Sequence, residues 1–380
     1  MILLKNLTIF SEDNIVTNGY IKFDDKIREI GSNTNEKGID MKGLIAIPGF
    51  IDTHIHGVNG YDNMDDDPNA VLEIAKILPH EGTTSFLATT MTETKENILT
   101  SLKHIRNAML NKNKPGAEIL GIHLEGPFIN ILAKGGQRGN AIVEPSIALF
   151  DEFNEASGYQ IKHVTIAPEI RGALPLIEHM EKKSIVSSVG HTKATSQEVL
   201  DALSVGCHCF THAYNAMSGL HHRDIGSVGE MLLNDNTYAE LICDKVHVSP
   251  QAVKLLYKAK TADKILLITD SMRAKLLSDG ESELGGQKVY VNKGVVRLAD
   301  GTLAGSILRL IDGAKNMQEI NQLGLKEIIK MTSVNPAKIH NFYDRKGSLK
   351  VGKDADILIV DNQLNLYETY CLGNLSYQKD

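Results

Sequence analysis

The sequence contains no tryptophan and only four cysteines among its 380 residues. So few cysteines do not make a disulfide framework of the kind that holds secreted domains together. No apolar stretch approaches the roughly 18 residues that a membrane span needs. Near the N-terminus, Lys5, Glu12 and Asp13 interrupt any apolar region of a signal peptide. We therefore expect a cytoplasmic protein with reduced thiols and no membrane partner.

An excess of positive charge is also missing. Lys and Arg total 40 against 47 Asp and Glu, the formal net charge is −7, and no basic run occurs. This balance argues against nucleic acid as a partner. The apolar fraction of 42% is enough for a substantial core. The length allows two or three domains of ~150 residues, or one α/β barrel of about 250 residues with a smaller domain.

Both ends of the chain are rich in short strand patterns separated by turn signals. They resemble each other and differ from the middle of the sequence. This arrangement predicts one small β domain, a β-sandwich, assembled from both termini. We expect its two parts to be residues 1–46 and 345–380, with residues 47–344 forming the main domain.

Eight short apolar runs alternate with helical patterns in the main domain. A Thr195–Glu198 capping box and a Ser249-Pro250 start mark two of the helices. Strands this apolar are buried on both faces, which favours a parallel sheet covered by helices and closed into a (β/α)8 barrel. The functional residues of such a barrel lie at the carboxyl ends of its strands. The runs are residues 44–56, 82–90, 118–126, 162–169, 184–191, 207–216, 238–244 and 263–270.

The first and third runs end in residues that bind metals. His54 and His56 are two positions apart, so both imidazoles project from the same face of a strand. Zinc and iron accept imidazole nitrogen well. In the third run, Glu125 shares a face with His123, and Gly126-Pro127 stops the strand directly afterwards. Its carboxylate could complete one metal site or bridge two cations.

Three further runs end in the same kinds of residue. His191 ends the fifth, His212 the sixth and Asp270 the eighth. Each is a weak signal alone, but their common position at strand ends makes the combined signal strong. By contrast, Cys207 and Cys209 alternate with His208, which indicates a buried strand with small apolar thiols rather than a metal cluster.

The segments PGFIDTHIHG and GSLKVGKDADILIVD, a later histidine at a strand end and the TD near the eighth run resemble the amidohydrolase superfamily. More narrowly, HLEGPF, VGHTKA, THAYNAM, DKVHV and TDSM are similar to the N-acetylglucosamine-6-phosphate deacetylases. The resemblance extends from about residue 44 to 360 in the same order. It implies metal-dependent hydrolysis of a linear amide in amino-sugar catabolism or cell-wall sugar recycling, with an amino-sugar phosphate as substrate.

The resemblance also implies roles for individual residues. Glu125, His191 and His212 match the metal site that all members share, and His54 and His56 match the pair that binds a second metal in some of them. Zinc or iron is expected, with one or two ions per subunit. Asp270 matches the general base and acid. The matching substrate contacts are Gly136, Gln137, Asn215, Ala216, Arg223, His247, Leu303, Ala304 and Gly305.

The resemblance further implies a homodimer in which Arg223 reaches the neighbouring active site and meets the sugar phosphate. One departure from the family pattern lies in the loop over residues 128–142, where Gly136-Gln137 stands for a pair that usually contains alanine.

Three alternatives remain open at this point. One is a deacetylase for the galacto epimer of the substrate, since the departing loop could face the sugar. Another is a cyclic amidohydrolase or deaminase, although the fourth run lacks a lysine at its carboxyl end and Glu125 supplies a carboxylate instead. The last is a non-catalytic protein that binds metal or sugar phosphate, which would be expected to have lost Asp270 or a ligand.

Overall fold

The computed structural model describes residues 1–111 and 116–379 of the chain. Eight parallel strands in this part of the chain form one sheet. Seven lie within the predicted apolar runs, and the remaining one, over residues 161–166, begins one residue before its run. Their sheet order runs without interruption from β15 back to β6. The strands are β6 (Phe50–Ile55), β9 (Thr83–Thr90), β10 (Glu118–Glu125), β11 (Ile161–Ile166), β12 (Val186–Val189), β13 (Cys207–Phe210), β14 (Tyr238–Ile242) and β15 (Ile265–Ile268).

The sheet closes into a barrel next to β6. The backbone N–H of Asp270 donates to the carbonyl oxygen of His54 at 2.8 Å, and that of His56 donates to Ser271 at 2.9 Å. All eight side chains of β9 are buried, as expected for a strand covered on both faces. The predicted (β/α)8 barrel is confirmed.

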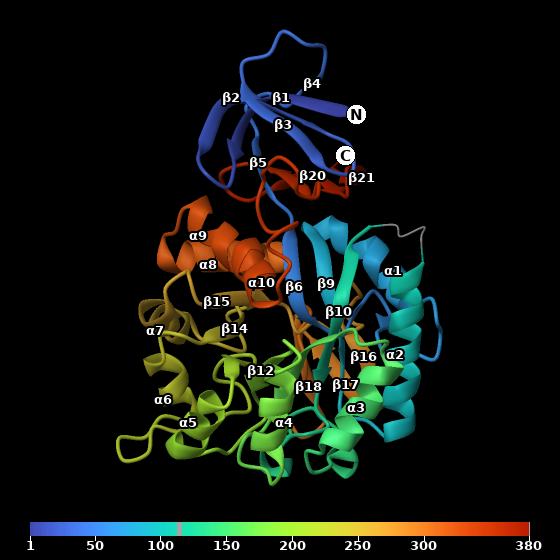
Figure 1. Cartoon of the computed structure of the whole chain (residues 1–380), viewed down its shortest axis with the longest axis vertical. Coiled ribbons are helices and arrows are strands. Elements are labelled where there is room, and N and C mark those ends of the chain that lie inside the picture. Colours follow the sequence, from blue (N-terminus) through green and yellow to red (C-terminus); the bar gives the residue numbers. More distant parts are fainter. Residues whose placement is uncertain (112–115, 380) are drawn as a thin grey trace.

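Helices surround the barrel and cover its outer face (Figure 1). The Thr195 side chain and Glu198 form the predicted capping box, and Ser249 caps the helix that starts at Pro250. The helices are α1 (Ala70–Ile77), α2 (Lys95–Leu110), α3 (Ile147–Ala156), α4 (Ala173–Glu181), α5 (Ser196–Ser204), α6 (Gly226–Leu233), α7 (Pro250–Lys260), α8 (Leu310–Asn321), α9 (Leu325–Ile329) and α10 (Asn335–Ile339). Short 3₁₀ turns cover residues 78–81, 131–133 and 139–141, and a π-helical turn covers 330–334. None of the described helices combines the length and the apolar character that crossing a membrane would require.

Strands from the two ends of the chain pair in a separate sheet, which lies above the barrel in Figure 1. Ile357–Val360 of the C-terminal part runs antiparallel to Ile45–Pro48 of the N-terminal part, which joins the two. The separate β-sheet domain built from both termini is thereby confirmed, while its exact boundaries stay a prediction. Its strands are β1 (Ile2–Phe10), β2 (Ile15–Phe23), β3 (Ile27–Ser32), β4 (Ile39–Asp40), β5 (Ile45–Pro48), β19 (Ile357–Val360), β20 (Leu366–Cys371) and β21 (Asn374–Gln378).

A three-stranded antiparallel sheet between β15 and α8 was not predicted. It consists of β16 (Gly280–Leu284), β17 (Gln287–Asn292) and β18 (Val295–Leu298). The sequence carries its signal, because Gly285-Gly286 and Lys293-Gly294 separate three runs of alternating character. The short strands β7 (Gly57–Val58) and β8 (Tyr61–Asp62) form a further hairpin after β6.

Candidate active site

Six predicted side chains converge where the barrel strands end, and we call them the mouth cluster. Each lies in the last residues of a strand or within two residues after it. Because parallel strands bring their carboxyl ends to one side of the barrel, residues that are distant in sequence become neighbours. The mouth cluster consists of His54, His56, Glu125, His191, His212 and Asp270.

Glu125, His191 and His212 form the first group of the mouth cluster. Oε1 of Glu125 lies 3.2 Å from Nε2 of each histidine, and the two Nε2 atoms are 3.1 Å apart. Nδ1 of His191 donates to the carbonyl oxygen of Ala133 at 2.8 Å, so its neutral ring carries a lone pair on Nε2. Ligands of a tetrahedral zinc ion are about 3.3 Å apart. The triangle therefore fits one face of a metal site.

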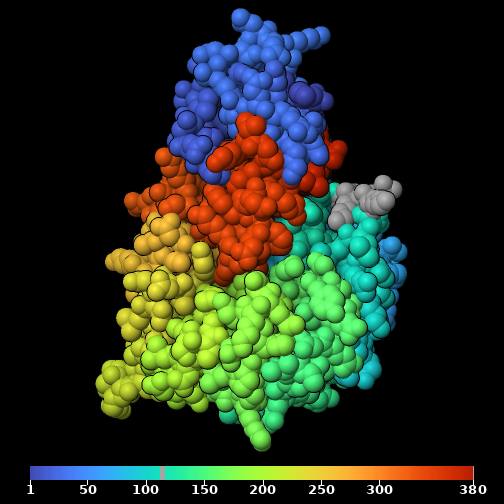
Figure 2. Space-filling view, viewed as in Figure 1, coloured from blue at the N-terminus to red at the C-terminus, as the bar shows by residue number. Residues whose placement is uncertain are grey.

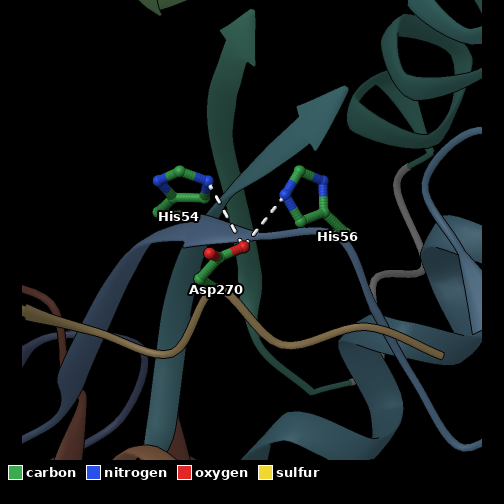
Figure 3. A group of neighbouring side chains, drawn as sticks. All are labelled: His54, His56 and Asp270. Atoms are coloured by element: carbon green, nitrogen blue, oxygen red, sulfur yellow. Dashed lines mark ion pairs between the residues drawn. The ribbon is translucent and has the colours of Figure 1, made fainter. Parts of the chain in front are cut away.

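The second group joins His54, His56 and Asp270 (Figure 3). Oδ1 of Asp270 lies 3.1 Å from Nε2 of His56 and 3.6 Å from Nε2 of His54. The Nε2 atom of His54 is fully buried and has no hydrogen-bond partner among residues 1–111 and 116–379. Oε2 of Glu125 faces this second group, 3.3 Å from Nε2 of His56, so Glu125 stands between the two groups.

The mouth cluster favours positive charge. Burial alone raises the pKa of the Glu125 carboxyl, but His54, His191 and His212 outweigh burial and hold it well below its ordinary value. Burial likewise opposes the charged form of His56, yet Asp270 and Glu125 raise its pKa to about 9. Positive charge can come from protons on the imidazoles or from a bound cation. Buried nitrogen and oxygen donors with converging lone pairs fit a divalent transition metal.

Several backbone conformations at the mouth are unusual for residues other than glycine. His191, His212 and Asp270 have φ angles of 50°, 32° and 47°, and Ala216 has 50°. Such left-handed positions cost of order 1–3 kcal/mol each and persist where the surroundings fix them, often at functional sites. Here they turn the chain sharply at the strand ends.

A cavity of about 520 Å³ opens over the mouth cluster. Its wall includes Leu284 and Arg297 from the unpredicted β16–β18 sheet. Five members of the mouth cluster line the cavity, all except His54. The predicted substrate contacts that line it are Gly136, Gln137, Asn215, Ala216, His247, Leu303, Ala304 and Gly305.

The Gln137 side chain makes a contact that the sequence did not suggest. Its Nε2 donates to Oε2 of Glu125 at 2.6 Å, and its Oε1 accepts from the backbone N–H of Thr92 at 2.7 Å. Gln137 is therefore held between the loop and a candidate metal ligand. Its role as a substrate contact stays a prediction.

Three cationic side chains lie at the cavity. Nδ1 of His247 is 2.6 Å from Oδ2 of Asp244, and although burial opposes the charge, this carboxylate raises the pKa of His247. Lys193 and Arg297 also line the wall, and sequence reasoning missed both. For Lys193, the sequence offered one signal of a place at the cavity, which is its position two residues after His191.

Arg223 lies apart from the cavity of its own chain. It is exposed, and its Nη1 is 2.8 Å from Nε2 of His222. The segment between β13 and α6 that carries it projects from the body at the lower left of Figure 1 and of the space-filling view in Figure 2. The expected contact with a neighbouring subunit stays a prediction.

The cysteines of β13 have the predicted structural environment. Cys207 and Cys209 are buried free thiols, and burial raises the pKa of Cys207 to about 12. His208 points to solvent, 3.2 Å from Glu181.

The mouth cluster is a candidate metal site at the mouth of a (β/α)8 barrel, and residues 45–378 match the amidohydrolase family. The chain belongs to this family. Its relatives narrow the assignment to the amino-sugar-phosphate deacetylases. The N-acetylglucosamine-6-phosphate deacetylase of Bacillus subtilis (strain 168) is 42% identical, with 99% of this chain and 97% of the relative covered.

Two further proteins bear on the substrate. The N-acetylgalactosamine-6-phosphate deacetylase of Escherichia coli O157:H7 is 37% identical over 87% of this chain and 88% of its own. A mutant of the N-acetyl-D-glucosamine-6-phosphate deacetylase of Mycobacterium smegmatis has been solved in complex with N-acetyl-D-glucosamine-6-phosphate. It superposes with a TM-score of 0.93 at 26% identity and covers 99% of both chains.

Proposed function

We propose that this chain hydrolyses the acetamide of N-acetyl-D-glucosamine 6-phosphate to acetate and D-glucosamine 6-phosphate. The observation that carries the proposal is the triangle of Glu125, His191 and His212 beside Asp270, at the floor of a cavity large enough for a sugar phosphate. Glu125, His191 and His212 would hold a divalent cation, which would lower the pKa of water and polarise an amide carbonyl. The nitrogen and oxygen donors suit zinc or iron, and the two groups of the mouth cluster suit one or two ions.

Asp270 is proposed as the general base and acid. Burial raises the pKa of its carboxyl, but His54 and His56 outweigh burial and lower it, so the side chain is ionised and can accept a proton. It would take the proton of the attacking water and return it to the departing amine. Protonation matters because an unprotonated amine is a very poor leaving group.

The phosphate would be recognised by the cationic side chains at the cavity. His247, with its raised pKa, is the predicted contact. Arg223 of a neighbouring subunit is proposed to add a planar bidentate donor, which requires a homodimer. The exposed position of Arg223, away from its own cavity, is consistent with a contact in trans.

A comparison of three substrates tests this proposal. Purified protein of known metal content would be offered N-acetylglucosamine 6-phosphate, its galacto epimer and the unphosphorylated sugar, and acetate release measured for each. We expect preference for the first substrate. Comparable rates with the unphosphorylated sugar would reject phosphate recognition, and no release from any of the three would reject the function.

A second candidate substrate is N-acetylgalactosamine 6-phosphate, which differs in the orientation of one hydroxyl group. The observation that favours it is the loop over residues 128–142, which departs from the family pattern and supplies Gly136 and Gln137 to the cavity wall. A preference for the galacto epimer in the same comparison would keep the mechanism and change the substrate.

A further inference from the structure

Glu240 is a buried carboxylate below the mouth cluster that the proposed mechanism does not use. It lies in the middle of β14, and its side chain is 0% exposed. Within residues 1–111 and 116–379, its ion pairs are with histidines alone. Burying a carboxylate costs several kcal/mol unless close partners compensate. A close partner inside the barrel must therefore compensate for the burial of Glu240.

That partner is His54. Oε2 of Glu240 lies 3.0 Å from Nδ1 of His54, and the backbone N–H of His212 points to the same oxygen at 3.4 Å. A carboxylate only accepts hydrogen bonds, so Nδ1 of His54 carries the hydrogen and donates. The lone pair of a neutral His54 is then on Nε2.

Nε2 of His54 is the atom that faces the mouth cluster. It lies 3.5 Å from Oε1 of Glu125 and 3.6 Å from Oδ1 of Asp270, and the described part of the chain offers it no hydrogen-bond partner. Glu240 therefore selects the tautomer of His54 in which Nε2, the atom that faces the mouth cluster, can bind a cation. Carboxylates that receive the second N–H of a metal-binding histidine commonly fix its ring in this way.

A metal held by Glu240 itself is a competing explanation, since His54, His123 and Glu240 bring ligand atoms close together. His123 does not support it. Its Nδ1 donates to the carbonyl oxygen of Thr53 at 3.1 Å, and its Nε2 lies 2.8 Å from Oγ1 of Thr165. Burial and the neighbouring His163 and His54 also hold the pKa of His123 well below its ordinary value. Both nitrogens of this ring are already engaged.

The second carboxylate oxygen of Glu240, Oε1, faces a pair of histidines. Nε2 of His163 is 3.9 Å from Oε1 of Glu240, beyond hydrogen-bond distance, and Nδ1 of His163 is 3.0 Å from Nε2 of His340. Oε2 therefore carries the hydrogen bonds of the Glu240 side chain, and these lead to the two groups of the mouth cluster.

We infer that Glu240 is a positioning residue for the second metal group, because it fixes the ring orientation and tautomer of His54 for an ion held with His56 and Asp270. This inference rests on the proposed metal-dependent function. It predicts that loss of Glu240 selectively weakens one of two ions, while the ion at Glu125, His191 and His212 is retained.

Ion counting tests the inference directly. Metal-free wild type, Glu240→Gln and Glu240→Leu would be reloaded with Zn²⁺, freed of excess metal and analysed for ions per chain. We expect two ions in the wild type and one in Glu240→Leu. Glu240→Gln, which keeps an acceptor oxygen, should bind the second ion about 10–100-fold more weakly.

His54→Gln serves as the benchmark for loss of the second ion. The matched control is Glu230→Gln, because Glu230 is also a buried glutamate but pairs with Ser196 rather than a histidine. The control should keep two ions. Two ions bound to Glu240→Leu with wild-type affinity would overturn the inference, as would a single ion in the wild type.

Histidine NMR on the zinc-loaded wild type reports the tautomer of His54 in the protein that keeps Glu240. The His54 ring, assigned by comparison with His54→Gln, should show a protonated Nδ1 and a metal-bound Nε2. A protonated Nε2 would overturn the inference. Acetate release by the same wild-type preparation reports separately on the proposed function, which fails if two ions bind and no acetate appears.

Discussion

Two clusters of charged residues differ in how their carboxylates are paired. The junction cluster lies where the chain passes from the barrel back to the β-sheet domain, and it contains Glu118, Arg345, Lys346, Asp354 and Asp356. Lys346 Nζ lies 2.9 Å from Glu118 and 3.0 Å from Asp354, and Arg345 pairs with the same two carboxylates. In the mouth cluster, the ion pairs of the described residues join Glu125 and Asp270 to histidines alone.

The difference separates a structural charge cluster from a binding one. Permanent cations of the chain satisfy the junction carboxylates, so that cluster is complete in the folded protein. The mouth carboxylates face imidazoles, which are neutral or charged according to conditions and offer lone pairs to a metal. We interpret these histidine-paired carboxylates as the part of the structure that a bound cation completes.

The largest effect is expected from Asp270→Asn. Removing the proposed proton acceptor should lower acetate release by about 10²–10⁴-fold, because general acid–base catalysis contributes factors of this size. The ion at Glu125, His191 and His212 should stay bound, as counted by metal analysis. Asp62→Asn, which changes a buried aspartate outside the mouth cluster, is the control. Wild-type rates in Asp270→Asn would rule out its acid–base role.

Lys346→Met tests the structural role of the junction cluster. It leaves the junction carboxylates without a fully buried cation, which should lower the free energy of unfolding by about 3–5 kcal/mol in urea denaturation. Metal content per folded chain should not change. Lys350→Met removes an exposed lysine paired with Glu12 and should cost under about 1 kcal/mol. Equal effects of the two substitutions would contradict the structural role of the junction cluster.

The pH dependence of stability distinguishes buried neutral histidines from those of the mouth cluster. Burial lowers the pKa of His340 to about 4, against about 6.5 in the unfolded chain. The unfolded chain therefore binds a proton between these values that the native protein does not. This should reduce the free energy of unfolding by up to about 3 kcal/mol as pH falls from 6.5 to 4.

His340→Gln should remove that part of the pH dependence. Urea unfolding gives the free energy of unfolding of wild type and variant across this pH range, and one curve is subtracted from the other. The contributions of the mouth histidines are common to both proteins and cancel in the difference. His208→Gln, at an exposed position, is the control for replacing a histidine by glutamine. Identical slopes for wild type and His340→Gln would contradict the assignment.

The smallest effect is expected from Arg223→Ala. If a neighbouring subunit supplies this side chain to the phosphate, KM for the phosphorylated substrate should rise about tenfold, or ~1.4 kcal/mol, with little change in kcat. Activity on the unphosphorylated sugar should not change. Arg28→Ala, at an exposed site of the β-sheet domain, is the control. Sedimentation as a monomer would also count against the contact in trans.

The barrel could be predicted because its strands are buried on both faces and therefore read as continuous apolar runs. Strand ends in a parallel barrel meet on one side, so His54, His191 and Asp270 could be grouped without knowing any contact between them. Helix starts at Thr195 and Ser249 were readable because capping depends on neighbouring residues alone.

Contacts that depend on the path of a loop could not be predicted. The bond from Gln137 to Glu125 requires the loop after β10 to fold back over the mouth, and local sequence does not specify that path. Glu240 is one polar residue in an apolar strand, and its pairing with His54 appears only when the closed barrel places β6 and β14 on either side of β15. The β16–β18 sheet was missed although its glycine turns were visible.

Metal dependence is the most direct test of the central claim that a cation completes the mouth cluster. The protein would be stripped with a chelator and titrated with Zn²⁺, and bound ions and acetate release from N-acetylglucosamine 6-phosphate would be measured on the same samples. We predict that stripped protein is inactive and that acetate release rises with the first ion bound per chain. Full activity in protein that contains no bound metal would contradict the account.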